Sequence, residues 1–240
     1  MSLPAPDTYD ALTFDVYGTL IDWEPAILDR LQDWAARNEV EATRNDLLEG
    51  FDRARAHYQA LTPHVPYPAV LRSAFSYIAN TYDIVPDADE RAAFGQSVPE
   101  WLPYADTNDA MARLKEKYTL GALTNMDEAQ FAASHARLNG CFDVIVTAER
   151  AQAYKPSLPH FVLGLTDLAA RGIPPKRVLH VAQSLRADVR PANLLGLDIV
   201  WINRKGRGLG HTGFGAELAV PMAEFPTMEA FVDALLGGKS

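Results

Sequence analysis

The stretch Leu12-Thr13-Phe14-Asp15-Val16-Tyr17-Gly18-Thr19-Leu20 decides most of what the sequence says about the fold. Ala11–Phe14 is a short apolar run of the kind that forms a buried parallel strand. Gly18 permits a sharp turn soon after it. Asp15 is therefore expected at the carboxyl end of a strand, where open α/β sheets have their ligand crevice. A carboxylate in that position can act as a nucleophile and form a covalent ester.

Length and composition limit the classes of protein that need to be considered. The 240 residues suffice for one domain with an insertion or for two small domains. Hydrophobic residues make up 48% and charged residues 22%, as in soluble globular proteins. The net charge is −9, with 22 basic against 31 acidic residues, which argues against nucleic acid as a partner. A small anionic substrate needs only a few local cations and stays open.

Cysteine content and apolar runs bear on the compartment. Cys141 is the only cysteine, so no disulfide can form within the chain, which fits a reducing compartment. The first ten residues have neither a basic cluster nor an apolar core of the signal-peptide type. No apolar stretch approaches the length of a membrane span. These features predict a cytoplasmic protein without membrane contact.

Strand-like and helix-like segments alternate along the chain. Strands are expected at 11–14, 119–123, 144–146, 178–181 and 199–202, and helices at 106–118, 128–138, 158–171 and 186–195. Such alternation is typical of a parallel sheet covered by helices on both faces. The predicted fold class is therefore α/β.

Residues 22–103 interrupt this alternation. Apolar residues recur there at helical spacing, first Ile27, Leu28, Leu31 and Trp34, and later Val70, Leu71, Phe75 and Ile78. We expect an all-helical cap inserted after the first strand, with residues 1–21 and 104–240 forming the core domain. A cap at this point of the chain would lie over the carboxyl ends of the strands.

Further polar residues follow the other expected strands. Because the carboxyl ends of parallel strands meet at one edge, these residues should lie near Asp15. Lys155 would keep that carboxylate ionised, and Thr124 and Asn125 could donate hydrogen bonds to an anionic group. Asp188 could orient or deprotonate water. Each residue alone fits an ordinary turn or surface position; their order and context together favour a site.

With these motifs in order, the chain resembles the haloacid dehalogenase superfamily. The matching segments are Asp15-Val16-Tyr17-Gly18-Thr19-Leu20, Leu123-Thr124-Asn125, Tyr154-Lys155-Pro156 and Val181-Ala182-Gln183-Ser184-Leu185-Arg186-Ala187-Asp188. The resemblance covers essentially the whole chain. It implies a Rossmann-like parallel-sheet core with a helical cap, and a homodimer is common among such proteins.

Two residues separate the branches of this superfamily. Its phosphatases carry a second aspartate where this chain has Tyr17, and an acidic residue of the fourth motif stands where this chain has Gln183. A hard divalent cation prefers several carboxylates, so a magnesium site is not expected. The tyrosine pattern resembles the L-2-haloacid dehalogenases, whose members need no metal. No cofactor is therefore implied, and the implied substrate is a small 2-substituted carboxylate.

The resemblance also implies a role for each matching position. Asp15 would attack carbon 2 of the substrate, Thr19 would support the nucleophile loop, Lys155 would hold charge beside Asp15, and Asp188 would handle the hydrolytic water. An (S)-2-haloacid would give an (R)-2-hydroxyacid. The positions expected to contact the substrate are Val16, Tyr17, Thr124, Asn125, Gln183, Ser184 and, in the cap, Arg53.

The leaving group remains open, because the chain departs from the branch around it. Phe161 and Leu185 stand where the branch has a tyrosine and an asparagine, and the position of the cap arginine falls near Asp52, with Arg53 and Arg55 close by. The chain also resembles (S)-azetidine-2-carboxylate hydrolase at Asp22-Trp23-Glu24, Ser184-Leu185 and Pro191-Ala192-Asn193. A ring nitrogen could therefore depart instead of halide. A phosphatase-like or catalytically silent relative completes the alternatives.

One further segment invites a phosphate-loop interpretation. Residues 204–210, Arg-Lys-Gly-Arg-Gly-Leu-Gly, are basic and glycine-rich and follow an expected strand. Their spacing matches neither nucleotide-binding pattern, and no clear helix follows. A mobile surface loop is the favoured interpretation.

Overall fold

The structure is a computed structural model that describes residues 3–61, 65–206 and 218–237. Its centre is a six-stranded sheet in the order β5-β4-β1-β6-β7-β8, in which every neighbouring pair is parallel. The strands are β1 (Ala11–Phe14), β4 (Thr119–Thr124), β5 (Val144–Thr147), β6 (Val178–Ala182), β7 (Asp198–Ile202) and β8 (Ala223–Phe225). The chain adds β4 and β5 on one side of β1 and then returns to add β6, β7 and β8 on its other side, so the crevice opens at the carboxyl end of β1. The α/β prediction is confirmed.

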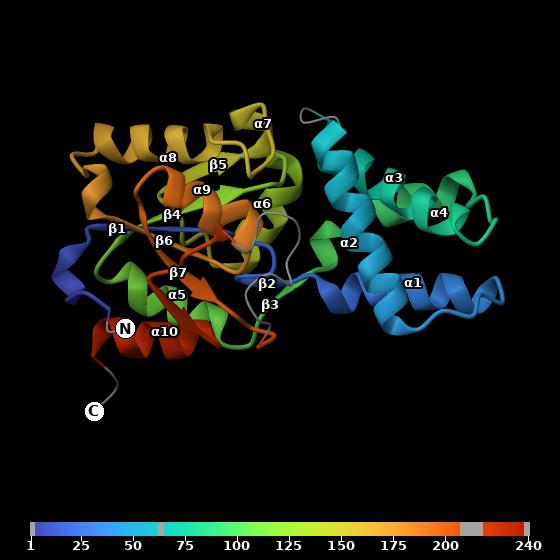
Figure 1. The fold of residues 1–240 in the computed structure, drawn as a ribbon, viewed down its shortest axis with the longest axis horizontal. Coiled ribbons are helices and arrows are strands. Elements are labelled where there is room, and N and C mark those ends of the chain that lie inside the picture. Colours follow the sequence, from blue (N-terminus) through green and yellow to red (C-terminus); the bar gives the residue numbers. More distant parts are fainter. Residues whose placement is uncertain (1–2, 62–64, 207–217, 238–240) are drawn as a thin grey trace.

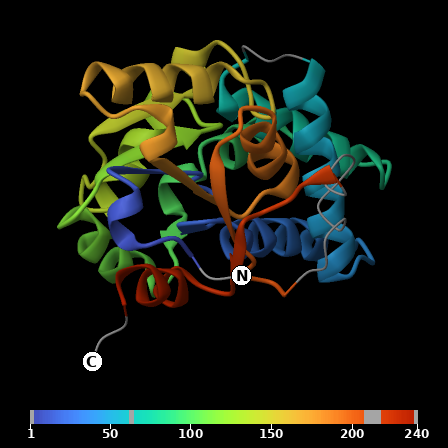
Figure 2. The ribbon, with the colours of Figure 1, turned by 60° about the vertical axis from the view of Figure 1, so that its left-hand side comes forward.

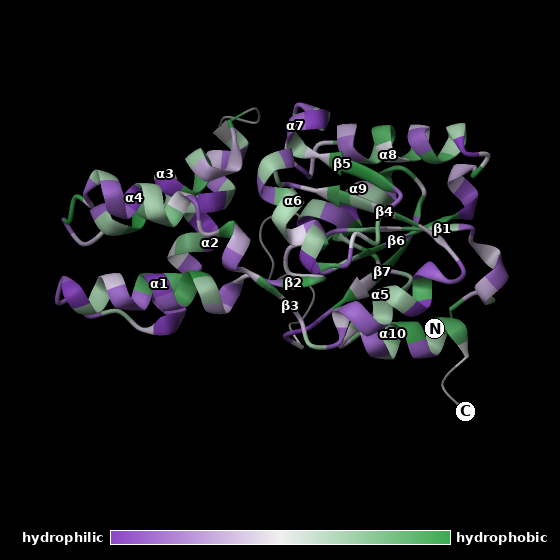
Figure 3. Ribbon diagram, turned by 180° about the vertical axis from the view of Figure 1, so that it is seen from behind, coloured by the Kyte–Doolittle hydropathy of each residue, from purple (hydrophilic) through white to green (hydrophobic). Residues whose placement is uncertain are grey.

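Two apolar clusters cover the two faces of the sheet. Leu12 and Phe14 of β1 point into the larger cluster, with α5 (Thr107–Lys115) and α10 (Met228–Leu236). Ala11 points into the other, with α8 (Pro159–Ala170) and α9 (Arg190–Leu194). Figures 1 and 2 show α8 on one side of the sheet and α10 on the opposite side. In Figure 3 the central strands are largely hydrophobic, as strands buried on both faces should be.

Four helices follow β1 and form the segment called the cap below: α1 (Glu24–Arg37), α2 (Arg44–Leu61), α3 (Tyr67–Asn80) and α4 (Ala88–Gly95). They lie together beside the sheet in Figure 1. Aromatic side chains fill their centre: Phe75 stacks on Phe94 with ring centroids 4.8 Å apart, and Trp34 meets Phe75 edge-on at 5.7 Å. The helical periodicity in this segment therefore arises from the cap's own core.

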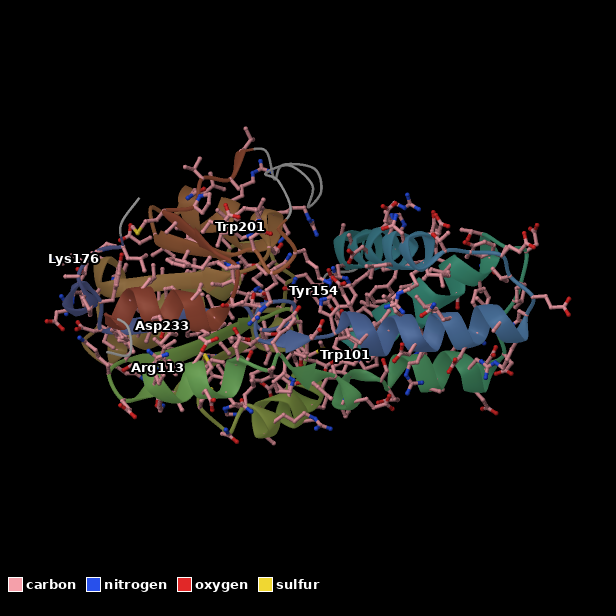
Figure 4. The ribbon with its side chains drawn as sticks, turned by 90° about the horizontal axis from the view of Figure 1, so that it is seen from below. Trp101, Arg113, Tyr154, Lys176, Trp201 and Asp233 are labelled. Atoms are coloured by element: carbon pink, nitrogen blue, oxygen red, sulfur yellow. The ribbon has the colours of Figure 1, made fainter. Side chains whose placement is uncertain are left out.

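A short antiparallel pair lies between the cap and the sheet. Its strands are β2 (Ile21–Asp22) and β3 (Leu102–Pro103). The sequence shows neither, because two-residue strands carry no periodicity. The proposed domain boundaries, 21/22 and 103/104, fall at this pair. Figure 4 shows Trp101 and Tyr154 at the same junction, where the Tyr154 hydroxyl of the core donates a 2.5 Å hydrogen bond to the Val65 carbonyl of the cap.

The observed elements differ from the expected ones mainly after residue 184. The helix expected at 186–195 is a π-helical turn, η4 (Leu185–Val189), followed by α9. The helix expected at 128–138 is α6 (Glu128–Arg137). The sequence reasoning missed the short helix α7 (Ala148–Ala151), the strand β8 and the helix α10. Within the described residues, no helix is both long and apolar enough to cross a membrane.

Candidate active site

A cavity of about 570 Å³ lies at the carboxyl ends of the strands, where the cap meets the sheet. The core contributes Asp15, Lys155 and Asp188 to its lining, and the cap contributes Arg55, Gln59 and Tyr67. Asp15 and Lys155, 140 positions apart in the chain, thus line the same cavity, as predicted from their places after the carboxyl ends of parallel strands.

Lys155 connects the two carboxylates. Its Nζ donates to Asp15 Oδ1 at 2.9 Å, to Asp188 Oδ1 at 2.6 Å and to the Leu123 carbonyl at 2.6 Å. The Lys155, Asp15 and Asp188 side chains are 1%, 10% and 0% exposed. All three protons of the ammonium group are used, so the lysine head group is fixed in position. The result is a buried ion triad with one carboxylate, Asp15, at the edge of the cavity.

Asn125 holds the backbone that carries this lysine. Its Oδ1 accepts from the Lys155 N–H at 2.6 Å and its Nδ2 donates to the Lys155 carbonyl at 3.1 Å. The side-chain amide, expected to contact substrate, is therefore engaged with protein. Thr124 differs: it is fully buried, and its Oγ1 has no hydrogen-bond partner among the described residues.

The loop after β1 positions Asp15 through Thr19. The Thr19 hydroxyl donates to Asp15 Oδ2 at 2.8 Å and accepts from the Gln183 N–H at 2.8 Å, which joins the first and fourth motifs. Gly18 has φ +97°, a left-handed conformation that favours glycine. A Cβ at Gly18 would lie 3.1 Å from Gln183 Oε1, so the turn also needs the missing side chain for space.

The charges of the triad shift its pKa values in different directions. Burial raises the pKa of Asp15, and Lys155 opposes this rise while Asp188 adds to it. Burial also acts against ionised Asp188, but Lys155 and His180 together hold the pKa of Asp188 below its ordinary value. The pKa of Lys155 is raised, because two carboxylates outweigh the effect of burial. Asp15 is thus a carboxylate whose ionisation depends on Lys155.

His180 is a buried residue of the site that sequence reasoning passed over. It lies on β6 with no exposed surface; Nε2 is 3.3 Å from Asp188 Oδ1 and Nδ1 is 2.8 Å from Thr13 Oγ1. His180 Nε2 and Lys155 Nζ both contact the same oxygen of Asp188, Oδ1. The other oxygen, Oδ2, is buried and has no hydrogen-bond partner among the described residues.

His160 holds the neighbouring strand end in a similar way. Its Nε2 lies 3.1 Å from the Thr124 carbonyl, and burial together with the charge of Lys155 lowers the pKa of His160 to about 3. A neutral imidazole donates its proton to that carbonyl. The sequence signal for both histidines was weak, because each looks like an ordinary core residue.

The cap presents its polar side chains from one face of α2. Asp52, Arg55 and Gln59 are spaced three and four residues apart, which places them on neighbouring turns. Arg55 donates to Asp52 Oδ1 at 2.8 Å, lies 5.4 Å over the Trp23 ring and contacts the Tyr67 hydroxyl. Of the cap arginines weighed from the sequence, Arg53 is exposed at the rim of the cavity, and the partly buried guanidinium is that of Arg55.

The remaining sequence-predicted positions are distributed between the site and its support. The Val16 side chain is fully buried in the core. Tyr17 lines the cavity, but its hydroxyl donates to Ser134 Oγ at 2.7 Å. Gln183 and Ser184 also line it; Ser184 Oγ accepts from the Ala187 N–H at 3.0 Å and so caps the π-helical turn.

The basic loop expected at the surface begins inside the structure. The Arg204 side chain is 7% exposed, donates to the Thr19 carbonyl at 2.9 Å and pairs with Asp106 at 2.9 Å. Lys205 pairs with Glu24 at the mouth of the cavity. The surface-loop prediction is therefore wrong for Arg204, and residues 207–210 lie outside the described residues.

A family model of the haloacid dehalogenase-like hydrolases matches residues 9–196, which include all four motifs. The chain belongs to this family. This chain is 24% identical over 202 residues to an (S)-2-haloacid dehalogenase of Pseudomonas putida, and the match covers 81% of this chain and 84% of that one. It is 27% identical over 213 residues to the 5-amino-6-(5-phospho-D-ribitylamino)uracil phosphatase YigB of Escherichia coli, covering 84% and 87%.

The fold of this hydrolase agrees with a solved member of the dehalogenase branch. The L-2-haloacid dehalogenase of Xanthobacter autotrophicus with chloropropionic acid covalently bound superposes with a TM-score of 0.75 at 20% identity, over 97% of this chain and all of that one. The superposition bears on the fold, and the relatives named as (S)-2-haloacid dehalogenases support the branch inferred from Tyr17 and the other motifs.

The donor set of this hydrolase does not fit magnesium. Among the described residues, the carboxylates bonded to the Lys155 ammonium are those of Asp15 and Asp188, and the ammonium lies between them. Among the described residues, no group of three or more His, Cys, Asp or Glu side chains is arranged to hold a metal ion. A divalent cation beside Lys155 would meet a positive charge and too few oxygen ligands.

Proposed function

We propose that this hydrolase displaces a substituent from carbon 2 of a small carboxylate, with halide as the leaving group and an ester on Asp15 as the intermediate. The observation that carries the proposal is the buried Lys155 ammonium bonded to both Asp15 and Asp188. A site with two carboxylates and one fixed cation supplies a nucleophile and a base in a water-poor space. The relatives named as (S)-2-haloacid dehalogenases support the halide assignment.

In the first step an Asp15 carboxylate oxygen attacks carbon 2 from the side opposite the halogen. The carbon–oxygen bond forms as the carbon–halogen bond breaks, and halide leaves with the bonding electron pair. The configuration at carbon 2 inverts, so an (S)-2-haloacid gives the (R) product. Lys155 and Thr19, each bonded to Asp15, hold the carboxylate in line for this attack.

In the second step water attacks the carbonyl carbon of the Asp15 ester and Asp188 accepts its proton. The oxygen that accepts is Oδ2, which the protein leaves without a partner among the described residues, whereas Oδ1 is held by Lys155 and His180. Cleavage of the acyl–oxygen bond releases the 2-hydroxyacid. Asp15 then carries one oxygen from water, and the hydroxyl oxygen of the product comes from Asp15.

The two ends of the substrate meet different walls. At one end, the substrate carboxylate would face the loop after β4, where Asn125 and Met126 line the cavity; the Thr124 hydroxyl has no partner among the described residues, but it is fully buried and lies outside this lining. Arg55 is held by Asp52 and Tyr67, and its buried Nε has no partner among the described residues. We assign this guanidinium to the departing anion, in place of the exposed Arg53.

A nitrogen leaving group is the second candidate, and Tyr67 favours it. The Tyr67 hydroxyl contacts Arg55 in the cavity, and burial raises the pKa of Tyr67. A neutral phenol can donate its proton to a departing amine, whereas halide needs none. Phe161 is buried against His180, with ring centroids 5.2 Å apart, so it adds no hydroxyl for either leaving group.

The test is halide release from (S)- and (R)-2-chloropropionate, with EDTA present. Release from the (S) enantiomer alone, with the protein gaining the mass of the ester during turnover, supports the proposal. Asp15→Asn is the control and should release no halide. Magnesium-dependent release of phosphate from a phosphate ester, or halide release by Asp15→Asn, would overturn the proposed function. Single turnover in H2¹⁸O should label Asp15 and leave the product unlabelled.

A further inference from the structure

One partly buried cation at the cavity has no ion-pair partner among the described residues and is not used by the proposed reaction. Arg186 lies on the π-helical turn η4, is partly buried and lines the cavity. Among the described residues, its guanidinium makes no ion pair and no side-chain hydrogen bond. Arg53, which also lines the cavity, is exposed, and four further cations of the lining are paired: Lys155 with Asp15 and Asp188, Arg55 with Asp52, Arg204 with Asp106, and Lys205 with Glu24.

Arg186 belongs to a π-helical turn that borders the cavity. The Ser184 carbonyl accepts from both the Asp188 and Val189 N–H groups at 3.1 Å, so the first turn is wider than an α-helical one. Such turns are frequent at functional sites. Asp188 and Arg186 thus both border the cavity from one short segment, and the first is buried in the triad while the second is free.

Gln59 provides a neutral donor in the same cavity. Its side chain is 5% exposed and lines the cavity, and Nε2 has no acceptor among the described residues. A buried amide donor without an acceptor costs free energy, which a bound acceptor would restore. Gln59 follows Arg55 by four residues on α2, so the two lie on one face of the helix.

Electrostatics place Arg186 close to the cap. Burial lowers the pKa of Arg186 and the positive charge of Arg55 lowers it further, while Asp188 and Asp52 act in the opposite direction. Both of those carboxylates are neutralised by their own partners, Lys155 and Arg55. A carboxylate bound to Arg186 would therefore supply the counter-charge that Asp188 and Asp52 do not provide.

The cavity is also larger than a two- or three-carbon acid requires. Its volume of about 570 Å³ lies in the range of pockets that hold considerably larger ligands. The proposed function uses Asp15 for carbon 2 and Arg55 for the leaving group, and it places the substrate carboxylate beside Asn125. Arg186 and Gln59 are left for a group beyond carbon 2.

We propose that Arg186 and Gln59 form a subsite for a second carboxylate, so that the preferred substrates are 2-substituted dicarboxylates. This rests on the proposed displacement at carbon 2 by Asp15. The guanidinium donates two parallel hydrogen bonds to a carboxylate, and the Gln59 amide donates a third. In a four-carbon dicarboxylate one methylene group joins carbon 2 to the second carboxylate, which is the group that would bind Arg186.

The experiment compares two four-carbon substrates that differ only at the far end. These are (S)-2-chlorosuccinate, which carries the second carboxylate, and (S)-2-chlorobutyrate, which carries a methyl group. We expect kcat/KM to favour chlorosuccinate by at least about tenfold. Arg186→Met should lower the chlorosuccinate value roughly 10- to 100-fold, the usual effect of losing hydrogen bonds to a charged group, and should change the chlorobutyrate value less than about threefold. Gln59→Leu should act in the same direction and less strongly.

Arg190→Met is the matched control. Arg190 begins α9 four residues further on and does not line the cavity. Its replacement should leave both substrates and their ratio unchanged. If the wild-type protein releases chloride from chlorobutyrate but does not prefer chlorosuccinate, or if Arg186→Met reduces both substrates equally, the dicarboxylate subsite is refuted while the proposed function stands.

Absence of chloride release from either substrate would refute the halide function and leave the subsite to a second measurement. Succinate and butyrate have no leaving group, and their binding to the wild-type protein can be measured by calorimetry. Tighter binding of succinate that Arg186→Met removes supports the subsite. Equal binding of the two acids, or a succinate preference that survives in Arg186→Met, overturns it.

Discussion

Lys155→Met is the sharpest perturbation of the proposed site, because methionine has nearly the length of lysine and no charge. The substitution removes three hydrogen bonds and leaves Asp15 and Asp188 buried without a cation. Breaking a buried ion pair by removing one partner costs about 3 to 5 kcal/mol. Since the three side chains are at most 10% exposed, solvent screening does not reduce this value much.

The same quantity predicts a change in pH dependence. One pKa unit corresponds to about 1.4 kcal/mol, so the loss amounts to about two to four units shared between two carboxylates. Asp15 must be ionised to attack, and its pKa already lies above the ordinary value. In Lys155→Met the acid limb of kcat/KM should therefore move to higher pH by about one to two units.

The difference in unfolding free energy between the wild-type and Lys155→Met proteins should also depend on pH. Asp188 has a lowered pKa in the folded wild-type protein, so its contribution to stability is present above its unfolded pKa and lost as pH falls. In Lys155→Met both carboxyl groups protonate more readily, which removes the unpaired charge. The stability difference between the two proteins should be about 3 to 5 kcal/mol at neutral pH and smaller towards pH 5.

The assay is urea unfolding at both pH values, with halide release recorded over the same range. Lys117→Met is the matched control, because Lys117 pairs with Asp7 on the surface at 2.6 Å with side chains 38% and 91% exposed. Its loss should leave the free energy of unfolding nearly unchanged, because solvent screens the pair. A Lys155→Met protein as stable as wild type at neutral pH, with an unmoved acid limb, would refute the argument that this cation keeps Asp15 ionised.

Two further substitutions test the supports of the site. His180→Phe removes the ring nitrogen 3.3 Å from Asp188 and should slow ester hydrolysis roughly 10- to 100-fold. The ester should then accumulate and be detected by mass spectrometry of quenched protein. Slowing of ester formation alone would contradict the role of His180 in positioning Asp188. Gly18→Ala should lose about 1 to 2 kcal/mol in urea unfolding from its left-handed backbone, and activity as well, because the new Cβ crowds Gln183. Gly172→Ala, with φ +83° and no atom within 4 Å of a Cβ, should show the backbone cost and full activity; similar activity in both variants would argue against that crowding.

Five of the six strands of the core sheet were predictable because each has a local signal, whereas the three-residue β8 was missed. Ala11–Phe14 is apolar throughout and is followed by Asp15 and a glycine turn, and β1 has those bounds in the structure. The strand ends then bring Lys155 and Asp188 to Asp15, as the parallel topology requires. What periodicity could not supply were the two-residue strands β2 and β3 and the π-helical form of η4.

Side-chain roles at the cavity were less predictable, because they depend on competition between partners. Asn125 has the donors that a carboxylate needs, yet both polar atoms of its amide bind the Lys155 backbone. Arg53 and Arg55 are two residues apart on α2, so they project in different directions, and only a helix placed against the sheet decides which one enters the cavity. In the sequence His180 looks like a core residue, and only the structure places its Nε2 3.3 Å from Asp188 Oδ1.

These differences divide the site into a part fixed by the sheet and a part set by the cap. The triad of Asp15, Lys155 and Asp188 rests on three strand ends and needs no cap residue for its hydrogen bonds. The cap contributes Arg55 and Gln59 from one face of a helix, where single substitutions change donors without disturbing the triad. Ester chemistry on Asp15 should therefore tolerate changes in the cap, while the choice of leaving group and of the distal substrate group should follow Arg55, Gln59 and the core residue Arg186.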